Sequence, residues 1–188
     1  YLDDQNQCTA VGRGAGENLN ASKCIAIGFE ALRGVNTSNL VTGTSNIAIG
    51  VKAGDALKTG SQNVLIGENA GGAMVGGHWN ILIGKDCATA ADLNGSVIIG
   101  IDAGTSGTGD NNVVIGKAAA DVGSWSGDNC IIIGHDADPS GSSVDNEITL
   151  GNASITKLRV PGLNSFEIND SGQFSGVSST ASGTAGVR

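Results

Sequence analysis

A short phrase recurs along this chain at nearly constant spacing. It reads NIAIGVKAG from Asn46, NVLIGENAG from Asn63 and NILIGKDCA from Asn80. The glycine after each aliphatic triplet serves as an anchor, and it falls at Gly12, Gly28, Gly50, Gly67, Gly84, Gly100, Gly116, Gly134 and Gly151. Successive anchors lie 16, 22, 17, 17, 16, 16, 18 and 17 residues apart. A repeat of this length predicts a solenoid of about nine circuits, each packed against the copies above and below it.

Three aliphatic positions precede each anchor and predict one β-strand per circuit. Side chains alternate between the two faces of a strand, so the first and third positions share a face and the middle position takes the other. The third position holds Val11, Ile27, Ile49, Ile66, Ile83, Ile99, Ile115, Ile133 and Leu150, and the middle position holds Ala10, Ala26, Ala48, Leu65, Leu82, Ile98, Val114, Ile132 and Thr149. Parallel strands that are apolar on both faces are covered on both faces. A thin coil can fill its interior with only one face, so we expect the other to pack against another chain.

The composition suits such a stack. Of 188 residues, 31 are Gly and only 3% are aromatic, which leaves few large side chains for the core of a conventional globular domain. We expect the anchor glycines to occupy turns with positive φ, which glycine adopts at low cost. In the central circuits these turn glycines are Gly50, Gly67, Gly84, Gly100, Gly116 and Gly134.

The repeated phrase N-[IV]-x-I-G-x-x-A-G resembles the head repeat of trimeric autotransporter adhesins and similar repeats in bacteriophage tail fibres. The resemblance covers roughly residues 8 to 154. The segment NEITLGNASITKLRVPGL, from Asn146 to Leu163, is closer to phage tail-fibre proteins, especially those of cyanophages. The resemblance implies an all-β fold, a left-handed parallel β-roll or β-solenoid, with three chains intertwined or side by side and apolar strands meeting along the axis. The circuits of 16–17 residues are longer than is typical of the adhesin heads.

The chain is expected to divide into two parts. Residues 1–138 form the regular β-roll, and PSGSS from Pro139 to Ser143 has the composition of a linker. Residues 139–188 are interpreted as a C-terminal β element with two strand-like runs, EITLG and ITKLRVPG, followed by a flexible tail rich in Ser, Gly, Ala and Thr.

Charge and hydropathy exclude several classes of partner. The formal net charge is −8 and Lys and Arg form no run, so nothing in the sequence indicates contact with nucleic acid or an anionic membrane surface. No stretch approaches the 18 or so consecutive apolar residues of a membrane span.

Residues that could carry catalysis are scattered. His78 and His135 are the only histidines, and neither has a second ligand at metal-binding spacing. A column two places after the anchor holds Glu30, Asp86, Asp102 and Asp136, but Lys52, Asn69 and Ala118 interrupt it. We therefore expect a solvated face there, with no metal, no cofactor and no catalytic residue. A glycan-cleaving spike remains an alternative, since such enzymes need carboxylates that converge in a groove.

A polar column lies four places before the anchor. It holds Asn46, Asn63, Asn80, Ser96 and Asn112, with Cys8, Cys24 and Cys130 in the remaining circuits of the roll. Stacked asparagines are expected to form a hydrogen-bonded ladder along the roll. We expect all four cysteines, including Cys87, to be small buried side chains with free thiols; a disulfide between Cys8 and Cys24 is the alternative, although adjacent parallel strands give it awkward geometry.

The variable part of each circuit is the expected place for recognition. All insertion falls between the conserved turns, most of it in RGVNTSNLVTGTS from Arg33 to Ser45, and scaffolded loops commonly carry binding residues. A tryptophan there can stack on a sugar ring while polar neighbours bind its hydroxyls. The alternative is that each tryptophan only seals a loop against the roll or against a neighbouring chain. The candidate receptor-binding residues are Trp79, His78, Trp125, Asn36 and Asn39.

These patterns together favour a homotrimeric, fibrous adhesion or receptor-binding segment without enzymatic activity. Its expected partners are further copies of itself, a host cell-surface glycan or protein, and other fibre or tail proteins. Its expected location is the virion, in a tail fibre, or the extracellular surface. The rival interpretations are a purely structural fibre shaft and a glycan-degrading tail spike.

Overall fold

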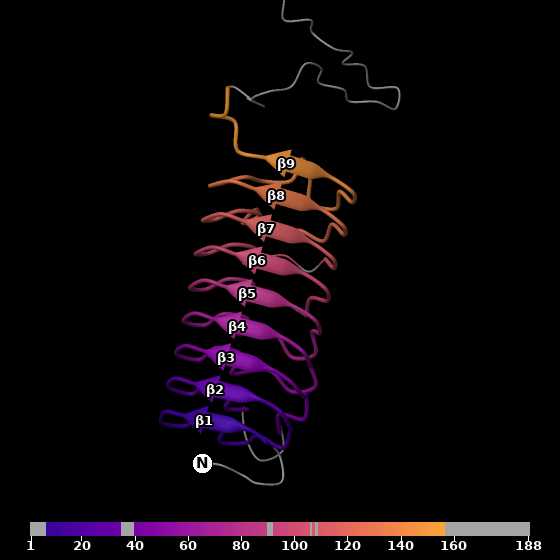
Figure 1. Ribbon diagram of the computed structural model, residues 1–188. Coiled ribbons are helices and arrows are strands. Elements are labelled where there is room, and N and C mark those ends of the chain that lie inside the picture. The colour runs from indigo at the N-terminus through magenta and orange to yellow at the C-terminus, as the bar shows by residue number, and fades with distance from the viewer. Residues whose placement is uncertain (1–6, 35–39, 90–91, 106, 108, 157–188) are drawn as a thin grey trace, which may run out of the picture. The chain divides into compact units, whose positions relative to one another are not determined.

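A computed structural model describes residues 7–34, 40–89, 92–105, 107 and 109–156. Nine strands of three residues each stack in chain order as one parallel sheet (Figure 1). The strands are β1 (Thr9–Val11), β2 (Ile25–Ile27), β3 (Ile47–Ile49), β4 (Val64–Ile66), β5 (Ile81–Ile83), β6 (Val97–Ile99), β7 (Val113–Ile115), β8 (Ile131–Ile133) and β9 (Ile148–Leu150). The chain makes about eight turns between β1 and β9, so the prediction of an all-β parallel solenoid is confirmed.

The register of the sheet follows the sequence repeat residue for residue. Leu65 of β4 pairs with Leu82 of β5, and Leu82 pairs with Ile98 of β6. The same alignment holds through all eight strand pairs, including the pair β2 and β3, whose circuit is the longest. The 22-residue step is therefore absorbed outside the strands, as the sequence predicts. None of the described residues forms a helix able to cross a membrane.

Each strand ends at its anchor glycine for two physical reasons. The six central turn glycines have φ between 136° and 148°, a region that residues with a Cβ strongly resist. In addition, the anchors stack directly on one another, so a Cβ on Gly84 would overlap the backbone oxygen of Gly100. The prediction of positive φ is confirmed, and the close approach of successive turns makes the requirement for glycine stricter.

The interior of the roll contains the middle residue of each strand. Leu65 and Leu82 are fully buried, and Ile98 is 2% exposed. The alanine column three places after the anchor faces them, and Leu57 and Met74 from the variable part of the circuit complete the core. The alternating strand pattern thus directs one column inward and leaves the first and third positions on the outer face.

The polar column before the strands forms the predicted ladder inside the roll. The Oδ1 atom of Asn46 accepts hydrogen bonds from the backbone N–H of Asn63 at 3.0 Å and from its Nδ2 at 3.1 Å. Asn63 accepts the same pair from Asn80, and Asn80 accepts the backbone N–H of Ser96. All four side chains are fully buried. The amide ladder therefore satisfies buried polar groups and connects successive circuits.

The four cysteines are buried and no disulfide joins them, as expected. Cys8 and Cys24 occupy adjacent circuits, and the Cys24 N–H donates to the Cys8 Sγ at 3.2 Å. Cysteine thus replaces asparagine in the ladder as a weak acceptor.

The regular sheet extends past the expected boundary between residues 138 and 139. β9 pairs with β8 in the same parallel register, and the compact unit continues through Ser154. PSGSS belongs to the circuit between these strands, where Ser140 binds the Glu147 carboxylate through its N–H and its hydroxyl. Serine and glycine suit a tight turn within a circuit as well as a linker. The second strand-like run and the tail lie mostly outside the described residues.

Candidate functional site

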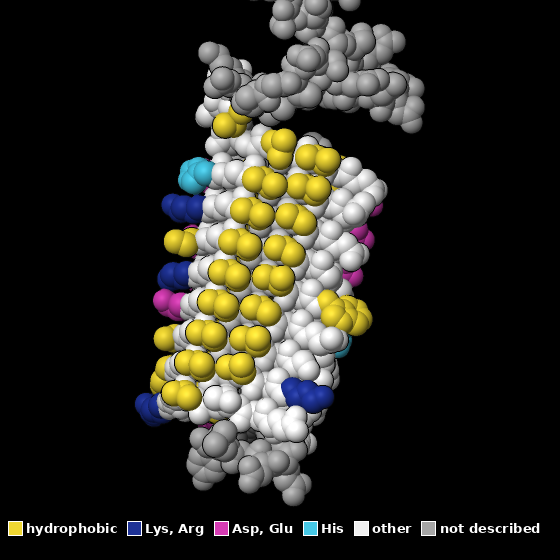
Figure 2. Space-filling view, in the orientation of Figure 1, with side chains coloured by type: hydrophobic (Ala, Val, Ile, Leu, Met, Phe, Trp, Pro, Cys, Tyr) yellow, Lys and Arg dark blue, Asp and Glu magenta, His cyan; other side chains and the backbone are white. Residues whose placement is uncertain are grey.

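The outer side of the sheet carries two aliphatic columns, shown as two parallel yellow rows in Figure 2. We call the surface formed by the first and third residues of β1 to β9 the apolar face. Every one of these residues except Thr9 is Val, Ile or Leu. Their exposure is substantial: Ile49 is 36% exposed, Ile81 40% and Leu150 54%. A contiguous exposed apolar patch is typical of an interaction surface.

The expected packing residues therefore separate into two groups. Ile49, Ile66, Ile83, Ile99, Ile115 and Ile133 lie on the apolar face, whereas Leu65, Leu82 and Ile98 lie inside the roll. The sequence predicted two faces but did not decide which one fills the interior. The structure makes that assignment.

Two further columns flank the apolar face. The leading edge, five places before the anchor, holds Gln7, Lys23, Ser45, Gln62, Trp79, Gly95, Asn111, Asn129 and Asn146. The trailing edge, one place after the anchor, holds Arg13, Phe29, Val51, Glu68, Lys85, Ile101, Lys117, His135 and Asn152. Figure 2 shows large hydrophobic and charged side chains on both flanks of the apolar columns.

Every residue of the leading edge has a positive φ, between 52° and 64°. The repeat pattern alone did not predict this constraint. The available signal was the recurrence of Gly and Asn in the column, because these residues tolerate the left-handed region best. Trp79 is the unfavourable case: a bulky side chain at φ 59° in a column that elsewhere holds small or polar residues.

Trp79 is the most exposed aromatic side chain among the described residues, at 62%. Its Nε1–H donates to the Gln62 Oε1 of the circuit below at 2.7 Å. The His78 ring lies beside it, with centroids 5.5 Å apart and planes at 44°. The indole is thus fixed at one edge while most of its surface remains available for a partner.

His78 belongs to a second hydrogen-bonded ladder. Its Nδ1 accepts the backbone N–H of Ser61 at 3.1 Å, and its own N–H donates to the Asn94 Oδ1 at 3.0 Å. Asp110 and Asp128 continue the pattern in later circuits, each accepting a backbone N–H from the circuit before it. His78 therefore has a structural role in pairing circuits, alongside any role in recognition.

Trp125 departs from its expected place on an outer loop. It is only 2% exposed and lies inside the roll, where a Cβ on Gly107 would approach its ring to 3.1 Å. Burying one large ring fills the space that Leu57 and Met74 fill in other circuits. Trp125 is thus a packing residue. Asn36 and Asn39 lie outside the described residues.

Carboxylates of the interrupted column two places after the anchor form contacts with neighbouring side chains. Glu30 contacts the Arg33 guanidinium at 2.9 Å, and Asp86 pairs with Lys85 and accepts a 2.8 Å hydrogen bond from Asn69 Nδ2. These contacts, Lys85 first, lower the pKa of Asp86. Among the described residues, no three His, Cys, Asp or Glu side chains gather as they would around a metal ion.

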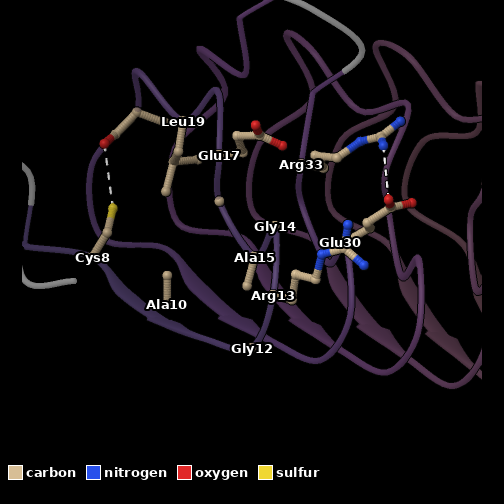
Figure 3. A pocket seen from close by; sticks show the side chains of 12 residues that line it. Cys8, Ala10, Gly12, Arg13, Gly14, Ala15, Glu17, Leu19, Glu30 and Arg33 are labelled. Carbon is tan, nitrogen blue, oxygen red and sulfur yellow. Dashed lines mark hydrogen bonds and ion pairs between the residues drawn. The ribbon is translucent and has the colours of Figure 1, made fainter.

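A cavity of about 710 Å³ lies at the first circuit (Figure 3). Ala10 and Leu19 contribute apolar side chains to its lining, and Arg13, Glu17 and Arg33 contribute charged ones. Cys8 also lines the cavity, and its thiol donates to the Ala21 carbonyl at 3.3 Å. The cavity is the lower end of the stack, where the interior columns of the roll begin.

Comparisons of the chain with protein-family models, with curated proteins and with solved structures found no match. The functional interpretation therefore rests on the chain's own fold and surfaces.

Proposed function

We propose that this chain is a segment of a homotrimeric fibrous attachment protein, of the kind found in phage tail fibres. It presents loops on a stiff stem and binds a host surface glycan or protein without chemical turnover. Its place is the virion or the extracellular surface, and other fibre or tail proteins continue the assembly.

The observation that carries this proposal is the apolar face. Fully burying one aliphatic side chain stabilises by roughly 1.5–3 kcal/mol, and these side chains are already partly buried. Covering the whole face would then contribute on the order of 10 kcal/mol per chain, which is comparable to the total stability of a small domain. Such a surface supports permanent association of copies side by side.

The stack itself supports the role of a stem. Nine strands at a spacing of about 4.8 Å give a column roughly 40 Å tall. Two ladders of side-chain hydrogen bonds connect the circuits, one buried at Asn63 and Asn80 and one partly exposed at Asp110, and every circuit is bonded to the next through its backbone. Differences in length between the conserved turns leave the sheet register unchanged, and loops on such a scaffold commonly carry binding residues.

The assembly is tested by measuring the mass of the folded protein. Light scattering and analytical ultracentrifugation at micromolar concentration are expected to give three times the mass of one chain. A folded monomer under these conditions would overturn the proposal, because the apolar face would then be stable in water.

The attachment role is tested separately on host cells and purified surface glycans. We expect the folded assembly to bind cells saturably, to compete with intact virions and to release no sugar fragments. Assembly without binding would instead support a structural shaft. Release of fragments would support a glycan-degrading spike.

A further inference from the structure

The two edges of the apolar face carry different side chains at each level of the stack. At the level of β5, Trp79 is on the leading edge and Lys85 on the trailing edge. Both are exposed: Trp79 by 62%, and the Lys85 side chain by 51% although it also pairs with Asp86. At this level neither edge complements a second copy of itself, but the Lys85 ammonium group complements the aromatic ring of Trp79.

Symmetry decides which edges can meet. If copies are related by rotation about an axis parallel to the stack, the leading edge of one chain meets the trailing edge of the next at the same level. This holds for a two-fold and for a three-fold axis, because rotation about that axis changes no height. If copies are instead antiparallel, like edges meet and the levels run in opposite order.

Matching leading and trailing edges at equal heights gives complementary pairs. At the level of β5 an ammonium group meets an indole, and at the level of β2 Lys23 meets Phe29, so both pairs allow a cation–π contact. At the level of β4 the Gln62 amide meets the Glu68 carboxylate. At the level of β6 Ile101, which is 48% exposed, meets Gly95, whose missing side chain leaves room for it.

The antiparallel arrangement lacks this complementarity. β5 is the middle strand of nine, so Lys85 would face the Lys85 of the other copy. Glu68 of β4 would face Ile101 of β6 and would lack the Gln62 amide that it meets in the parallel arrangement. Like charges in direct opposition are unfavourable, and an unpaired carboxylate at the rim of an apolar interface adds a desolvation cost.

We propose that copies of this chain associate parallel and in register through the apolar face, and that Trp79 of one chain packs against Lys85 of the next. This inference rests on the proposed function, since it assumes that the apolar face is an interface between copies. It assigns Trp79 to the seam between chains, so recognition of the host belongs to other loops. The strained backbone of Trp79 is then maintained by a contact that only the assembly completes.

Disulfide trapping tests the register. Asn111 and Lys117 are the exposed leading and trailing residues at the level of β7. Within one chain the whole strand separates them, which is too far for a disulfide. In the double variant Asn111→Cys with Lys117→Cys, mild oxidation is expected to link chains into a covalent ring that runs as a trimer on a non-reducing gel. The native protein is the baseline, since its own cysteines are buried.

Two matched variants distinguish the alternatives. Asn129→Cys with Lys117→Cys places the thiols one level apart and is expected to cross-link at least tenfold more slowly. Trp79→Cys alone links only if the chains are antiparallel. The proposed contact between Trp79 and Lys85 would be overturned if either variant linked faster than the in-register pair, or if the in-register pair did not link within a trimer of correct mass. Neither result would contradict the trimer itself. A monomeric mass would instead refute the proposed function itself.

Discussion

At the scale of single residues, backbone geometry restricts this chain more than side-chain chemistry does. The anchor glycines combine a φ near 140° with direct stacking on the next turn. The leading edge requires a second positive φ in each circuit. Substitutions at these positions therefore act through the backbone and should be costly even where the side chain would meet solvent.

Gly84→Ala tests this constraint. Its φ is 147° and its Cβ would overlap Gly100, so we expect a loss of about 3 kcal/mol or more in the free energy of unfolding. Gly123→Ala is the matched control: its φ is 48° and nothing lies within 4 Å of the added Cβ, so a cost of about 1–2 kcal/mol is expected. Urea denaturation of both variants measures the difference. Equal costs would show that stacking of the turns is unimportant.

The Cys87 thiol provides a second test at this scale. The side chain is fully buried, and burial raises its pKa to about 12. Because the thiolate is the reactive species, Cys87 should resist iodoacetamide at pH 8 in the folded protein and react rapidly in denaturant. Mass spectrometry of labelled peptides gives the extent of reaction. Rapid labelling under native conditions would show that this part of the roll opens.

At the scale of the element, each circuit is stabilised by its neighbours more than by itself. A three-residue strand has no independent stability, but the ladder at Asn46, Asn63 and Asn80 connects buried backbone and side-chain groups of successive circuits. The amide serves this purpose because it donates and accepts at once. Serine takes the same position at Ser96, where its hydroxyl accepts the Asn112 N–H.

Asn63→Ala should destabilise the roll by about 2–4 kcal/mol. The substitution leaves the buried Asn80 N–H and the Gly77 carbonyl without partners. Asn63→Ser should cost less, since a hydroxyl already replaces the amide at Ser96. Thermal and urea unfolding of the two variants check the order. The ladder would be dispensable if alanine were tolerated as well as serine.

The stability of the last described circuit should decrease at acidic pH. Hydrogen bonds from the Ser140 and Thr149 hydroxyls lower the pKa of Glu147 below its ordinary value of 4.5. A carboxylate with a lowered folded pKa stabilises the fold above its unfolded pKa, and that stabilisation is lost as the pH falls through the folded pKa. We expect Glu147→Gln to flatten the decline of unfolding free energy below pH 4.5. An unchanged pH profile would assign the acid response to other carboxylates.

At the scale of the whole molecule, the two faces of the sheet differ in environment: one is buried inside the roll and the other is the exposed apolar face. Leu82 lies inside and Ile83 lies on the apolar face, although they are adjacent in the chain. Packing within the chain depends on the first, and in the proposed assembly the association between chains depends on the second. The solenoid can thus lose one kind of contact while keeping the other.

Aspartate substitutions separate these contacts. Leu82→Asp buries an unpaired charge in the roll and should prevent folding or lower the melting temperature severely. Ile83→Asp should preserve the β-sheet signal in circular dichroism but reduce the measured mass toward that of one chain. Identical behaviour of the two variants would show that folding and assembly are inseparable.

The sequence by itself determined the period, the strand positions and the parallel register, because each follows from a local pattern repeated nine times. It also determined the asparagine ladder, because Asn46, Asn63, Asn80 and Asn112 occupy the same place in their circuits. Only the tertiary structure decided which apolar face is interior, since alternation makes both faces equally hydrophobic and the curvature of the circuit selects between them. The tertiary structure likewise decided where the two tryptophan side chains lie. Both occupy variable segments, yet Trp125 fills space inside the roll while Trp79 lies exposed on the leading edge. Loop sequence alone contains no information on the volume left inside a circuit.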